Sequence, residues 1–189
     1  MSAATVLPPA RLPWSGGRAA RVTDPAERDA VRAARRFARR HLGRTARRDS
    51  WTAEPVAAGG GRGGWVCSSP GVALLVVVDA HGRAAFVAPG ESAEHVLSGA
   101  AGRSAAEVEQ AAGWAVGLAV RLAARLGWPG RLEWTADEVP GLGWVCRPRG
   151  LGGALAVAVA GSGAHDVLRP GRSEVELLVE LAGGRQAAG

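Results

Sequence analysis

The sequence predicts an α+β protein made of two αββββα halves. Two observations support this prediction. Short apolar runs separated by glycine-rich turns lie between stretches with helical spacing of apolar residues. In addition, a Trp-Thr-Ala segment followed by Gly-Trp-Val-Cys occurs twice in the same order, once from Trp51 to Cys67 and again from Trp134 to Cys146. We interpret this repetition as a pseudo-twofold internal duplication.

The expected organisation has four segments. Residues 1–22 are rich in Pro, Ala and Arg without an apolar period, which is typical of a flexible tail. Residues 23–102 form the first half and 103–182 the second half. Residues 183–189 form a second flexible tail.

The first half is expected to begin with a helix. Thr23-Asp24-Pro25 offers a capping oxygen and a proline suited to the first turn, and Gly43 is a natural end after Leu42. Gly-rich or polar turns then separate four strands, and a short helix follows them. The expected strands are 50–57, 64–68, 72–79 and 84–88, and the expected helix is 92–98.

The second half repeats this order. It is expected to contain a helix over 104–126, strands over 131–139, 143–147, 154–160 and 164–168, and a closing helix over 173–181. The helix 104–126 has the less polar surface, so we expect it to be buried, whereas the Arg-rich helix 23–42 would face water or a partner.

Two such halves would remove each other's exposed sheet edge if they joined edge to edge. We therefore expect the antiparallel sheets to form one continuous sheet with helices mainly on one face. This order of elements over residues 25–182 is similar in outline to the saddle of the TATA-box binding protein. That family's DNA-contacting residues are not found at matching positions.

The composition excludes several kinds of chemistry. The chain has no lysine, so it has neither a Walker A loop nor a Schiff-base amine. Gly59, Gly61 and Gly64 have the G-x-G-x-x-G spacing. A strand follows them, however, whereas a nucleotide site needs a helix at this place. Cys67 and Cys146 lie in apolar strands and belong to no C-x-x-C pair, so we expect core thiols and no zinc. We predict no cofactor and no metal.

The positive charge is concentrated in one segment. Residues 11–48 hold 12 arginines against three acids, a net charge of +9, whereas the rest of the chain carries −3. A GC-rich genome and a solvated helix face are sufficient causes of this pattern, but it also suits an acidic partner or nucleic acid. The candidate binding residues are Arg28, Arg32, Arg35, Arg36, Arg39 and Arg40 with Trp51, Trp65, Trp134 and Trp144.

Three functions are compatible with these features. The first is a non-enzymatic binding or adaptor protein, chaperone- or immunity-like, with a protein partner. The second is a nucleic-acid-binding protein that uses the Arg-rich helix and the strand tryptophans, provided these lie on an open sheet face. The third, an enzyme with a pocket between the halves, is less favoured because we find no catalytic motif.

We also expect a cytoplasmic protein without membrane insertion. Met1–Trp14 lacks a basic start followed by an apolar run, and Arg121 and Arg125 interrupt the longest apolar stretch. A homodimer is compatible with the sequence.

Overall fold

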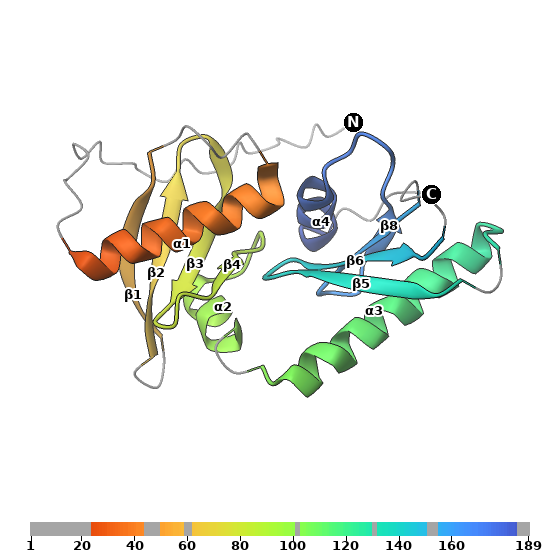
Figure 1. The fold of residues 1–189 in the computed structure, drawn as a ribbon, viewed down its shortest axis with the longest axis horizontal. Helices are drawn as coiled ribbons and strands as arrows, with labels where there is room; N and C mark the ends of the chain where they lie inside the picture. The colour runs from red at the N-terminus through yellow and green to blue at the C-terminus, as the bar shows by residue number, and fades with distance from the viewer. Residues whose placement is uncertain are drawn as a thin grey trace, which may run out of the picture.

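The computed structural model describes residues 24–43, 50–58, 62–100, 103–129, 132–150 and 155–184. These residues form an α+β fold of four helices and two antiparallel four-stranded sheets (Figure 1). The predicted tail 1–22 and residues 185–189 lie outside the described residues. The elements are α1 (Pro25–Leu42), β1 (Thr52–Ala58), β2 (Arg62–Ser69), β3 (Val72–Asp79), β4 (Ala84–Phe86), α2 (Ala93–Ala100), α3 (Ala105–Arg125), β5 (Trp134–Val139), β6 (Gly143–Pro148), β7 (Val157–Ala160), β8 (His165–Val167) and α4 (Glu174–Ala182).

Local capping signals explain where the two long helices begin. The Asp24 carboxylate accepts a hydrogen bond of 2.9 Å from the backbone N–H of Ala26 at the start of α1. Ser104 and Glu107 form a reciprocal capping box at the start of α3. Gly43, with φ of 68°, follows the last residue of α1. The predicted limits of α1 are therefore confirmed, as is the predicted start of α3.

The two sheets are separate, with strand orders β1-β2-β3-β4 and β5-β6-β7-β8. The expected continuous sheet is not confirmed, and neither is the saddle-like outline that depends on it. The halves meet through a turn, because the Phe86 N–H on β4 donates a 2.9 Å hydrogen bond to the carbonyl oxygen of Pro140. Pro140 lies between β5 and β6, so this contact is not a ladder between two strands.

Helices cover both faces of each sheet, so the expectation that they lie mainly on one face is wrong. Val76 and Val78 of β3 belong to the core beneath α1, whereas Val77 packs with Val96 and Leu97 of α2 on the opposite face. The second sheet lies between α3 and α4 in the same way (Figure 1). The physical reason is that β3 is apolar at both alternating positions, which requires cover on both sides.

One hydrophobic core joins the halves through faces that are not equivalent. It contains Ala34 and Phe86 from the α1 side of the first sheet and Val145, Leu177 and Leu178 from the α4 side of the second. α1 opens the first half, but α4 closes the second, and the end of α1 points towards α4 in Figure 1. A twofold arrangement would bring equivalent surfaces together. The shared core therefore indicates a head-to-tail arrangement in place of the predicted pseudo-twofold one.

The two long helices pack in the same manner, which corrects the expectation that the second would be buried and the first would face outward. Each buries a row of alanines against its sheet. These rows are Ala30, Ala33, Ala34 and Ala38 in α1 and Ala115, Ala119 and Ala123 in α3. The apolar surface of α3 is not fully covered, because Trp114 is 43% and Val120 42% exposed.

Candidate functional site

A cleft of about 720 Å³ opens where the two halves meet. One wall is the side of α1 that carries Arg36, Phe37 and Arg40, and the turn before β4 adds Arg83. The opposite wall comes from the second half, with Arg103 before α3 and the end of β5. Both halves are therefore needed to build this cleft.

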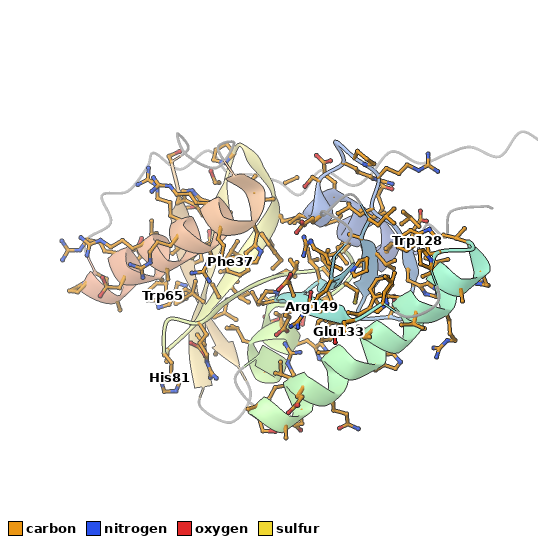
Figure 2. The ribbon with its side chains drawn as sticks, turned by 45° about the vertical axis from the view of Figure 1, so that its right-hand side comes forward. Phe37, Trp65, His81, Trp128, Glu133 and Arg149 are labelled. Carbon is orange, nitrogen blue, oxygen red and sulfur yellow. The ribbon has the colours of Figure 1, made fainter. Side chains whose placement is uncertain are left out.

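Phe37 and His41 give the cleft an aromatic patch, and the fully buried Phe86 packs against both rings. The Phe37 ring lies 4.6 Å from the His41 ring and 4.7 Å from the Phe86 ring, measured between centroids. Figure 2 shows Phe37 below α1, towards the first sheet. Burial and the neighbouring positive charge of Arg40 lower the pKa of His41, while Glu174 opposes this effect. His41 is thus uncharged at neutral pH and packs as an aromatic ring.

The charges around the cleft are unbalanced. Four arginines and two acids line it, so its net charge is +2 with His41 neutral. Both acids already have partners, because Glu138 pairs with Arg103 at 2.7 Å and Asp137 with Arg147 at 2.6 Å. Among the described residues, neither Arg36 nor Arg40 has an ion-pair partner. The α1 wall therefore offers two guanidinium groups to an incoming anion.

Arg83 is held in place by a carboxylate behind it. Its Nε donates to Asp79 Oδ2 at 2.7 Å and its backbone N–H to Oδ1 at 2.8 Å. Burial alone would raise the pKa of Asp79, but these hydrogen bonds and one from the His81 N–H bring it below its usual value. Asp79 and His81 therefore form a turn, and Asp79 orients Arg83 at the cleft.

The six predicted arginines take different positions relative to the cleft. Arg36 and Arg40 line the cleft. Arg28 and Arg32 lie nearer the start of α1, where Arg32 pairs with Asp29 at 3.4 Å. Arg39 is exposed in the last turn of α1, and the buried Nε of Arg35 has no hydrogen-bond partner among the described residues.

The four predicted tryptophans lie in the cores and form no row on an open sheet face. Trp51 and Trp144 are 6% and 7% exposed. Trp65 packs against the core beneath α1 and Trp134 against the core beneath α3. Trp134 also stacks on Trp128, which Figure 2 places near the end of α3, with 6.1 Å between ring centroids.

The sequence interpretation missed Arg83, Arg103 and His41 as lining residues. No local pattern marks them, because they come from three separate segments, and only the docking of the halves brings Arg103 to the other two. The idea of a pocket between the halves was the one signal available.

The described residues offer little for covalent or metal chemistry. They contain no group of three or more His, Cys, Asp or Glu side chains placed to hold a metal ion. Cys67 and Cys146 are buried free thiols, and burial raises their pKa to about 12 and about 11. Thiols of this kind are poor nucleophiles, because the thiolate is the reactive form.

Both cysteines are therefore expected to resist alkylation while the protein is folded. At pH 8 iodoacetamide should label native protein at least roughly a hundredfold more slowly than free cysteine, since so little thiolate is present. In concentrated urea both thiols should react rapidly, which mass spectrometry would show as two added groups. Fast labelling of either thiol in the native protein would contradict the burial of that strand.

No family model, curated protein or solved structure matches the chain. None of the four described helices combines the length and the hydropathy that a membrane span requires.

Proposed function

We propose that this is a non-enzymatic binding protein whose cleft between the halves takes an acidic segment of a partner protein. The observation that carries the proposal is the pair of unneutralised guanidinium groups, Arg36 and Arg40, beside the Phe37 and His41 rings. The cleft volume of about 720 Å³ lies within the range of ordinary ligand pockets. A cytoplasmic location is part of the proposal and rests on the sequence alone.

The chemistry of the cleft favours a segment that is both acidic and apolar. Phe37 and the uncharged His41 ring line the cleft and provide an apolar surface on which a hydrophobic side chain can lose its water shell. Arg36 and Arg40 lie one helical turn apart, so they can contact carboxylates on either side of that side chain. Nucleic acid fits less well, because the tryptophans that would stack on bases lie in the cores.

The proposal includes an internal duplication as the origin of the two halves. Their element order and strand order are the same. Trp65 and Cys67 pack on the core beneath α1, and Trp144 and Cys146 pack on the core beneath α3, so the repeated motif has the same place in each half. A cleft at the junction of two copies could then arise without altering either core.

Removing the cleft arginines is expected to weaken binding of an acidic peptide about tenfold, which corresponds to roughly 1.4 kcal/mol. The probe is a fluorescein-labelled glutamate peptide with a central phenylalanine, followed by anisotropy at low salt. The test variant is Arg36→Ala/Arg40→Ala. Its matched control is Arg28→Ala/Arg32→Ala, which removes the same charge at the same spacing from the same helix outside the cleft.

The control variant should bind within about threefold of the wild type, as expected for solvent-exposed charges. Equal loss in both variants would show that the peptide is attracted to the whole basic helix. That result would overturn the assignment of the binding site to the cleft. Undetectable peptide binding by the wild type would overturn the proposed function. Tighter binding to oligo-dT, with a steep loss of affinity as salt rises, would favour the nucleic-acid alternative.

A further inference from the structure

The outer side of α3 is a helix face that no other described element covers. Ala115, Ala119 and Ala123 point to the second sheet, and Figure 1 shows α3 along the edge of the molecule with its other side free. We define the outer face by residues at helical spacing. It consists of Glu109, Gly113, Gly117, Val120, Arg121 and Ala124.

This face has a composition that the fold of one chain does not explain. Val120 is 42% exposed, and Trp114 at its border is 43% exposed. A Cβ atom on Gly113 would meet nothing within 4 Å, and one on Gly117 would meet only the Arg121 guanidinium at 3.8 Å. A glycine in a helix interior costs about 1 kcal/mol relative to alanine. Neither glycine is required by packing within the chain, but both would let a second helix approach closely.

The charges on the outer face are arranged symmetrically about the middle of α3. Glu109 lies six residues before Ala115 and Arg121 six residues after it, and Gly113 and Gly117 are likewise two residues away on each side. Among the described residues, neither Glu109 nor Arg121 has an ion-pair partner. If the outer faces of two α3 helices cross antiparallel at the level of Ala115, Glu109 of each copy lies opposite Arg121 of the other.

We propose that the outer face of α3 binds a second copy of this chain, with the two helices antiparallel and crossing at the level of Ala115. The glycines form the closest contact, Val120 loses exposed surface, and Glu109 and Arg121 make two equivalent ion pairs. One helix pair buries less area than the roughly 800 Å² per partner of a stable complex. The dimer is therefore weak, with a dissociation constant on the order of 10–100 μM. The outer face shares no residue with the lining of the cleft, so the two proposals are independent.

Charge exchange on the full chain tests the dimer. Sedimentation velocity over a concentration series should show a monomer–dimer equilibrium for the wild type. Arg121→Glu brings two acids together at each end of the contact, so it should weaken the dimer roughly tenfold or more. Glu109→Arg/Arg121→Glu restores opposite charges and should recover wild-type association. Both residues are exposed, so circular dichroism should show an unchanged fold.

Arg125→Glu is the matched control, because it makes the same charge change on the same helix away from the outer face. It should leave the equilibrium within about threefold of the wild type. A wild type that stays monomeric at several hundred μM would overturn the proposal. So would a double variant that fails to recover association, or an Arg125→Glu variant as weak as Arg121→Glu.

Discussion

Replacing Gly141 with alanine is expected to destabilise the protein by roughly 2–5 kcal/mol. Gly141 lies in the turn between β5 and β6 with φ of +86°, and an added Cβ would lie 1.8 Å from the carbonyl oxygen of Phe86. The left-handed conformation costs another residue about 1–2 kcal/mol. The clash can be relieved only by moving the turn away from β4, which adds about 1–3 kcal/mol. Urea unfolding followed by circular dichroism measures the loss.

Gly90 provides a matched control for this substitution. It has the same φ of +86°, but a Cβ there would meet nothing within 4 Å. Gly90→Ala should therefore show only the conformational cost of about 1–2 kcal/mol. The difference between the two variants measures the close approach of the halves. Equal losses would mean that the β5–β6 turn does not rest on β4 in solution.

The order and approximate limits of the elements could be predicted because the signals for them are local. The strand expected over 72–79 is β3 with the same limits, and the helix expected from Ser104 begins with that residue as its cap. Alternating apolar residues, turn glycines and helix caps act within a few residues of the element that they define. Limits were less accurate beside loops, where β5 begins at Trp134 although a strand from residue 131 was expected.

The arrangement of the two halves could not be predicted in this way. An exposed sheet edge can be protected by another strand, by a turn or by a helix, and the local sequence does not distinguish these solutions. Here Pro140 of the β5–β6 turn accepts the Phe86 N–H at 2.9 Å. The continuous run of apolar residues in β3 did indicate cover on both faces. A prediction based on this run alone would have placed helices on both faces of the sheet.

The candidate site could be predicted only in part, because its position also depends on how the two halves dock. Arg36 and Arg40 belong to the basic helix that the charge count identified, but nothing in that helix distinguishes them from Arg28 and Arg32. The distinction comes from where the second half docks, which brings Arg103 and Glu138 opposite the end of α1. Repetition of Trp and Cys in both halves is explained by core packing, and it carries no direct information about the site.

Replacing Phe86 with alanine is expected to lower the free energy of unfolding by about 3–5 kcal/mol, the usual cost of deleting a buried phenylalanine ring. Phe86 is fully buried and packs against Phe37 and His41. Phe86→Leu keeps most of the apolar volume, so it should cost less than about 1.5 kcal/mol. Urea unfolding followed by tryptophan fluorescence measures both values, and the smaller loss in the leucine variant would show that side-chain volume dominates.

The same variant tests whether the halves fold together. Phe86 belongs to the first half, yet its core cluster includes Val145, Leu177 and Leu178 of the second. If this core is shared, Phe86→Ala should keep a single unfolding transition, and amide exchange should accelerate in β6 and α4 as well as in β3. A separate transition of the second half, with exchange in β6 and α4 unchanged, would show that each half is stable alone. The cleft would then lie between two independently folding units, and a ligand there would have to hold them together.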